Sequence, residues 1–166
     1  MTDAWTIRAA DVGDHAAVGA LNAANVPEVG VLDDDRLALF AARAEAFWVA
    51  EDVGEVVGLF VGLFDSHEYA SRNYRWFSDR HDRFAYVDRI ALAPSARGRG
   101  IADALYDRWE ALAVEHGVPL ACAEVNTVPA NPRSLAFHER RGFVRVAEEA
   151  PYGGDERVAM LERQLT

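Results

Sequence analysis

The sequence contains one cysteine, Cys122, and it has no apolar run of the roughly 18 residues that a membrane-spanning helix needs. A single cysteine excludes an intramolecular disulfide and is typical of a protein in a reducing compartment. The N-terminus does not resemble a secretory signal. We therefore expect a cytoplasmic protein that does not bind to or span a membrane.

Basic residues are also scarce, because 17 Lys and Arg residues stand against 27 Asp and Glu residues, which gives a net charge of −10. This balance argues against nucleic-acid binding through a basic surface. An acidic surface attracts cationic substrates such as amines or basic peptides, but it also serves solubility alone. The 5 histidines show no pair at ligand spacing, so we expect no metal site.

The chain of 166 residues is 51% hydrophobic, which suits one domain, residues 1–166, with a core of its own. It shows no internal repeat, linker or low-complexity tract. Apolar periodicity and turn residues predict the element order β-α-α-β-β-β-α-β-α-β-β. The strands are expected at 5–9, 47–51, 55–64, 86–92, 120–126, 144–148 and 157–164, and the helices at 12–25, from 33 onward, at 101–116 and at 132–141.

The most informative stretch joins a strand, a glycine turn and a helix. Residues 86–92 are apolar and β-compatible, and from Ile101 onward apolar residues recur at the spacing of one helix face. Between them, Gly98 and Gly100 let the backbone approach a ligand closely. The first N–H groups of a helix have no intrahelical partner, and the helix dipole adds positive potential there. The stretch therefore predicts an anion site, most often one for a phosphate.

Two familiar phosphate motifs do not match this turn. The loop of nucleoside triphosphatases needs Lys and Ser/Thr after its last glycine, but Ile101 and Ala102 follow Gly100. In the dinucleotide fingerprint Gly-x-Gly-x-x-Gly, Asp103 occupies the third glycine position. A Rossmann-type nucleotide binder is also disfavoured by the hairpin before the central strand, because a doubly wound fold alternates strands and helices.

A third pattern, Arg/Gln-x-x-Gly-x-Gly/Ala, matches Arg97, Gly100 and Ala102. This turn resembles the acyl-CoA pyrophosphate loop of the GNAT superfamily of N-acyltransferases. The block from Asn131 to Phe143 resembles the later GNAT segment, in which Asn opens a short amphipathic helix that ends at Gly-Phe. The resemblance implies an α/β (α+β) fold with a single mixed, centrally splayed sheet of about seven strands and about four flanking helices.

The same resemblance implies acetyl-CoA as the cosubstrate, with no metal. Backbone groups of the central strand pair with the pantetheine arm in this family, and the loop binds the pyrophosphate. Asn131 matches a residue that often contacts the pantetheine arm, although Asn is also a good N-cap. The residues that the resemblance assigns to the coenzyme are Ile90, Leu92, Arg97, Gly98, Arg99, Gly100, Ile101, Ala102 and Asn131.

Acyl transfer to an amine needs a base, and two carboxylates are candidates for it. Glu124 stands in an apolar strand, where a charge is costly unless it is paired or functional. In relatives that acetylate ribosomal proteins, the base is a strand glutamate two residues nearer the following helix. Asp88, on the neighbouring strand, is the second candidate. His138 occupies the place of the tyrosine that commonly reprotonates the thiolate, and an imidazole can donate a proton near neutral pH.

The acceptor residues are expected on the segment 65–83 and on the two central strands. A structureless loop of this length is often functional, and its aromatics either line a substrate site or pack into the core. The candidates are Tyr74, Trp76, Phe77, Tyr86 and Asn126. We expect an N-acetyltransferase acting on a primary amine of a small molecule or peptide. A non-catalytic coenzyme A-binding module is the alternative, and a homodimer stays open.

Overall fold

The computed structural model describes residues 4–165. Its contacts group the chain into two compact units. The first unit comprises Met1–Leu63 and Asp88–Ala111, and the second comprises Phe64–Val87 and Leu112–Thr166. The expectation that residues 1–166 form one domain stays a prediction.

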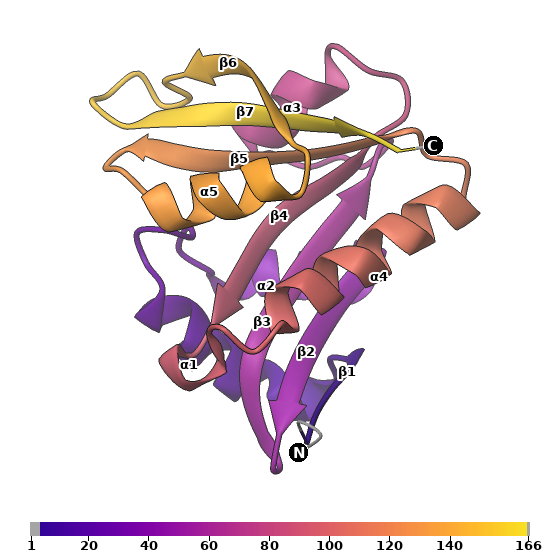
Figure 1. The fold of residues 1–166 in the computed structure, drawn as a ribbon, viewed down its shortest axis with the longest axis vertical. Helices are drawn as coiled ribbons and strands as arrows, with labels where there is room; N and C mark the ends of the chain where they lie inside the picture. The colour runs from indigo at the N-terminus through magenta and orange to yellow at the C-terminus, as the bar shows by residue number, and fades with distance from the viewer. Residues whose placement is uncertain (1–3, 166) are drawn as a thin grey trace. The chain divides into compact units, whose positions relative to one another are not determined.

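Seven strands form one sheet in the order β1-β2-β3-β4-β5-β7-β6 (Figure 1). They are β1 (Trp5–Ala9), β2 (Ala46–Asp52), β3 (Glu55–Phe64), β4 (Ala85–Leu92), β5 (Leu120–Val128), β6 (Val144–Glu149) and β7 (Arg157–Gln164). β4 and β5 are parallel, whereas β1–β2, β2–β3, β5–β7 and β6–β7 are antiparallel. The expected mixed sheet of seven strands is therefore confirmed.

The helices lie where the sequence predicts them, except in the segment 65–83, for which no helix was predicted. They are α1 (His15–Ala24), α2 (Asp34–Arg43), α3 (Arg72–Ser78), α4 (Ile101–Glu115) and α5 (Pro132–Arg140), with 3₁₀ turns at Val12–Asp14 and Pro94–Ala96. The prediction of a structureless loop over 65–83 was wrong, because α3 lies within it. The Ser71 side chain accepts a hydrogen bond from Tyr74 N, so this helix has an N-cap of its own.

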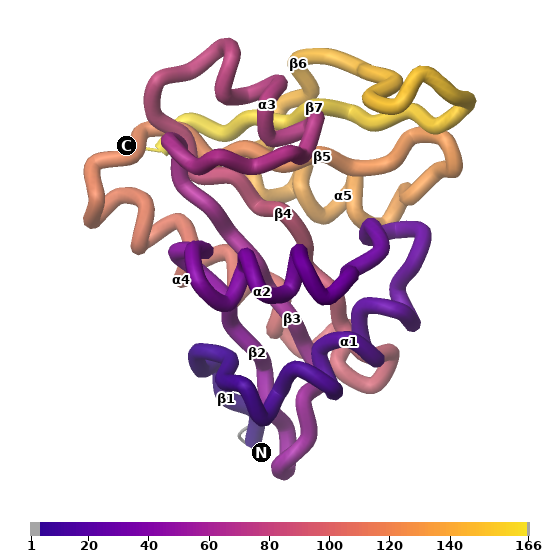
Figure 2. The backbone as a smooth tube through the Cα atoms, turned by 180° about the vertical axis from the view of Figure 1, so that it is seen from behind, coloured from indigo at the N-terminus to yellow at the C-terminus, as the bar shows by residue number. Residues whose placement is uncertain are grey.

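In the first unit, helices cover both faces of the strands β1 to β3. α1 and α2 lie on one face (Figure 2), and α4 lies on the other (Figure 1). The strand glycines permit this packing: a Cβ at Gly62 would stand 2.7 Å from the indole of Trp109 on α4. The β2–β3 register shifts between Ala50 and Glu51, opposite Gly58. Gly62 thus lies at a close approach of strand and helix, and Gly58 lies beside a β-bulge, two settings in which glycine is typical of a strand.

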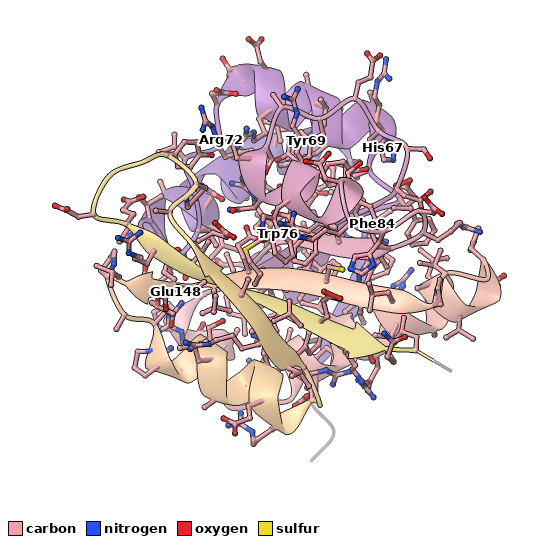
Figure 3. All side chains as sticks on the ribbon, turned by 90° about the horizontal axis from the view of Figure 1, so that it is seen from above. His67, Tyr69, Arg72, Trp76, Phe84 and Glu148 are labelled. Atoms are coloured by element: carbon pink, nitrogen blue, oxygen red, sulfur yellow. The ribbon has the colours of Figure 1, made fainter. Side chains whose placement is uncertain are left out.

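In the second unit, α3 and α5 lie on opposite faces of β5, β7 and β6 (Figure 3). Side chains alternate along β5, so Cys122 and Glu124 share one face. The ring of Tyr86 lies 5.9 Å from that of Phe77 on α3, and its hydroxyl bonds Glu124, so this is the α3 face. Glu124 therefore faces the helix that the sequence did not predict.

Candidate functional site

The loop before α4 has the geometry of an anion-binding turn. Gly98 and Gly100 have φ of 73° and 80°, a region that favours glycine. Gly100 O accepts from Ala104 N at 3.0 Å, so the helix opens directly after this glycine. A Cβ built on either glycine meets no atom within 4 Å, so the backbone is open where a ligand would approach. The loop therefore fits a phosphate group held by backbone N–H groups.

The two arginines of this loop have different surroundings. Arg97 is exposed. Arg99 donates from Nη1 to Asp52 Oδ2 at 2.7 Å, and this ion pair joins the loop to the end of β2. The charge of Arg99 is thus partly offset within the protein, whereas Arg97 presents its charge to solvent. The expected positive potential of the loop rests mainly on Arg97 and on the start of α4.

Asp88, the second candidate base, belongs to a buried polar network in the first unit. Its carboxylate accepts from Arg89 Nε at 2.8 Å, and the two side chains are 4% and 3% exposed. Arg89 Nη1 also donates to Asn22 Oδ1 at 2.8 Å and to Gly30 O at 2.9 Å. A buried guanidinium needs such a counterion. Charge balance therefore accounts for Asp88, and the sequence analysis missed this network although Asp-Arg stands inside an apolar strand.

The register between β4 and β5 is short. Within the second unit, it consists of two pairs of Cα partners, Ala85 with Ala121 and Tyr86 with Cys122. The other edge of β5 pairs with β7 from Leu120 to Val128.

Glu124 and Tyr86 form a direct pair on the α3 face. The Tyr86 hydroxyl donates to Glu124 Oε1 at 2.9 Å, and the Glu124 side chain is half-buried. Asn126, the next residue of β5 on this face, is half-buried too, and its carbonyl accepts from Asn131 N at 3.1 Å. The Asn131 side chain accepts from Ser134 N, which confirms the expected N-cap of α5. Three of the expected site residues thus lie on β4 and β5 within one unit.

His138 lies in the interior of the second unit, with 3% of its surface exposed. Its Nδ1 is 2.7 Å from Ser134 O, which only accepts, so this nitrogen carries the proton. Burial is the main cause that lowers the pKa of the imidazole to about 4, and the charge of Arg141 contributes to this shift. An imidazole that is neutral at pH 7 and donates its one N–H in a hydrogen bond to a carbonyl is a poor general acid. The geometry favours a structural role for His138 over the expected acid role.

The low pKa of His138 predicts a pH-dependent stability. The unfolded chain binds a proton at pH 6.5, whereas the folded chain does so only near pH 4. We expect the free energy of unfolding to fall by about 3 kcal/mol between pH 7 and pH 4 on account of this residue. Urea unfolding of the wild type and of His138→Phe at several pH values measures this. Equal losses in both proteins would contradict the assignment.

The aromatic residues of α3 divide into core and surface. Tyr74 and Phe77 are 1% and 0% exposed and pack into the second unit. Trp76 is half-buried, and its Nε1 donates to Glu149 Oε1 at 3.0 Å. The guanidinium of Arg80 lies 3.6 Å from the indole centroid. Figure 3 shows Trp76 between α3 and the strands, so it is the residue of the three that a ligand on this face could contact.

Two other kinds of feature are missing from the part of the chain that the structure describes. Within residues 4–165, no group of three or more His, Cys, Asp or Glu side chains is placed to hold a metal ion. None of the helices described above is both long and apolar enough to cross a membrane.

Comparison with known proteins identifies relatives of this fold. The family model described as acetyltransferase (GNAT) family matches residues 17–143. Ard1 from Thermoplasma volcanium is similar with a TM-score of 0.78 and 23% identity, over 98% of this chain and 99% of Ard1. Naa20 from Chaetomium thermophilum, solved with a bisubstrate analogue, gives 0.79 and 21% over 96% and 86%. YncA from Salmonella typhimurium, a putative acetyltransferase solved with acetyl-CoA, gives 0.71 and 23% over 99% and 95%.

Proposed function

Because the chain belongs to the acetyltransferase (GNAT) family, we propose that it is an enzyme that transfers an acetyl group from acetyl-CoA to a primary amine. The acceptor is a small molecule or a peptide, and the enzyme works in the cytoplasm. The observation that carries this proposal is the open glycine loop at the start of α4, with φ of 73° at Gly98 and 80° at Gly100. Its chemistry suits the pyrophosphate of coenzyme A.

Each part of the cosubstrate has a candidate partner. Backbone N–H groups from Gly98 to Ala102 would hold the pyrophosphate, and exposed Arg97 would add charge. The backbone of Ile90 and Leu92 would pair with the pantetheine arm, and Asn131 would contact the same arm. The pantetheine arm contains amides, which can form hydrogen bonds with the backbone of a strand.

In the proposed reaction, the Glu124 carboxylate takes a proton from the acceptor ammonium. The neutral nitrogen then attacks the thioester carbonyl carbon. The carbon–sulfur bond of the resulting tetrahedral intermediate breaks, the nitrogen loses its second proton to water, and the departing thiolate of coenzyme A takes a proton from water. The products are an acetylated amine and coenzyme A, with the proton on Glu124 returned to solvent. Half-burial of Glu124 and its bond to Tyr86 support this role, because a base must be held within reach of its proton.

The acceptor would be contacted by half-buried polar and aromatic groups on the α3 face. Trp76 and Asn126 are half-buried there, so each has surface to offer a ligand. Tyr74 and Phe77 are buried, and we propose that they support the site from within the core. Asn126 can both donate and accept hydrogen bonds, which suits an amine and its neighbouring carbonyl group.

A panel of amines with acetyl-CoA tests the proposal. We expect thiol release that requires both acetyl-CoA and one class of amine among small monoamines, polyamines and peptides with free N-termini. The measurement is the rate of thiol formation, with mass spectrometry of the acetylated product. Coenzyme A binding by calorimetry without thiol release for any amine would instead favour the non-catalytic binding module.

A further inference from the structure

Tyr86 lies on β4 with its ring buried and its hydroxyl directed at the proposed base. The side chain is 1% exposed, and its hydroxyl donates to Glu124 Oε1 at 2.9 Å. A tyrosine has one proton to donate, so this bond fixes its direction and restricts the rotation of the carboxylate. We propose that Tyr86 is a positioning residue that orients Glu124 for proton removal from the acceptor, an inference that rests on the function proposed above.

The ring of Tyr86 is itself held by the aromatic side chains of α3. Tyr74 meets it edge-on, with centroids 5.4 Å apart at 79°, and Phe77 lies 5.9 Å from it at 48°. Phe84, labelled in Figure 3, contacts both of these rings at 5.3 and 6.4 Å. The Tyr74 hydroxyl donates to Phe64 O at 2.7 Å, which ties this cluster to another residue of the second unit. Such tilted and edge-to-face contacts give the Tyr86 ring one preferred orientation.

The segment between β3 and β4 thereby gains a second role. The helix of this segment, α3, packs onto the ring of Tyr86, and through that ring it acts on the proposed base, Glu124. This role uses the buried residues Tyr74 and Phe77, which a ligand on the surface does not reach. A catalytic group is precise when its supporting shell is rigid, and four contacting aromatic rings form such a shell.

Other titratable groups share this face with Glu124. Cys122 lies two residues before it on β5, and Glu162 of β7 is the Cα partner of Cys122. His81, which follows α3, pairs with Glu162 at 3.0 Å. Burial raises the pKa of the Cys122 thiol, which therefore stays neutral. His81 thus contacts Glu162, whereas the Tyr86 hydroxyl acts on Glu124 by a direct hydrogen bond.

The test is Tyr86→Phe, which keeps the ring and removes the hydroxyl. We expect kcat to fall about tenfold, with KM for acetyl-CoA within about twofold. We also expect the acid limb of the pH profile to move up by about one pH unit, because the ionised carboxylate loses a stabilising hydrogen bond. The matched control is Tyr106→Phe, which removes the hydroxyl of a buried tyrosine on α4 in the first unit, and its acid limb should stay in place. If Tyr86→Phe does not fold, Phe77→Leu should produce a smaller shift in the same direction.

A second measurement separates this inference from the proposed function. Carbon-13 NMR of protein labelled at the glutamate carboxyls follows the titration of Glu124 without turnover, and Glu124→Gln assigns the signal. The midpoint should be higher in Tyr86→Phe than in the wild type by about one pH unit. Equal midpoints in Tyr86→Phe and the wild type would overturn the positioning role. So would an unchanged kcat and pH profile in Tyr86→Phe, provided that Glu124→Gln is inactive. Either outcome would leave the proposed activity standing.

Discussion

Replacing Glu124 by glutamine should lower kcat by about 10²–10⁴-fold, the usual contribution of a placed general base. Glutamine keeps the shape of the side chain and can still accept from the Tyr86 hydroxyl, so the fold should persist. The affinity for acetyl-CoA should change little. Raising the pH should restore part of the rate, because more of the acceptor amine is then neutral in solution. Steady-state kinetics from pH 6 to 9 would measure each of these effects.

Two controls accompany Glu124→Gln. Glu162→Gln alters a carboxylate of the same strand face that pairs with His81, and it should leave kcat near the wild-type value. Asp88→Asn tests the alternative base, but it also removes the counterion of buried Arg89. We expect it to lose about 3–5 kcal/mol of stability, so its kinetics need a parallel unfolding measurement. Near-normal turnover in Glu124→Gln, with an inactive but folded Asp88→Asn, would move the base to Asp88.

Replacing Gly100 by aspartate should weaken coenzyme A binding by about 100-fold or more. The new carboxylate would stand in the open space beside the loop, where the pyrophosphate is proposed to bind. Two like charges about 4 Å apart near a protein surface repel each other by several kcal/mol. Isothermal titration calorimetry with coenzyme A gives the affinity directly. An unchanged affinity in a folded variant would mean that the pyrophosphate binds elsewhere.

Gly54→Asp is the matched control for that substitution. Gly54 has a φ of 78° against 80° at Gly100, and a Cβ there also meets no atom within 4 Å. It lies in the β2–β3 turn of the same unit. Both variants therefore carry the same backbone strain and the same added charge, and both should lose about 1 kcal/mol of stability. Only Gly100→Asp should lose coenzyme A affinity.

The parts of the site that were predictable from the sequence depend on local signals. The turn at Gly98 and Gly100 needs a backbone conformation that glycine adopts readily, and its position between a strand and a helix is visible in the apolar pattern. Asn131 followed by proline is a helix start that neighbouring residues alone determine. The pairing of Glu124 with a residue of β4 follows from period-two alternation once the two strands are neighbours.

The missed features depend on burial, which distant parts of the chain decide. α3 has only 7 residues, two of them arginines, so its apolar stripe is Tyr74 and Phe77 alone. The Ser71 cap was the available signal for it. His138 has the position expected of an acid, but its pKa follows from enclosure by Phe137 and Phe143, which spacing does not reveal.

The loop before α4 offers its backbone through two glycines with φ of 73° and 80°, an arrangement that only the folded chain has. A molecule that binds this loop therefore binds the folded chain and not the unfolded one. Mass action then raises the free energy of unfolding, by about 2.7 kcal/mol when the free ligand stands at 100 times its Kd. The cellular supply of cosubstrate would thus set the lifetime of this chain against proteolysis, as well as its rate of turnover.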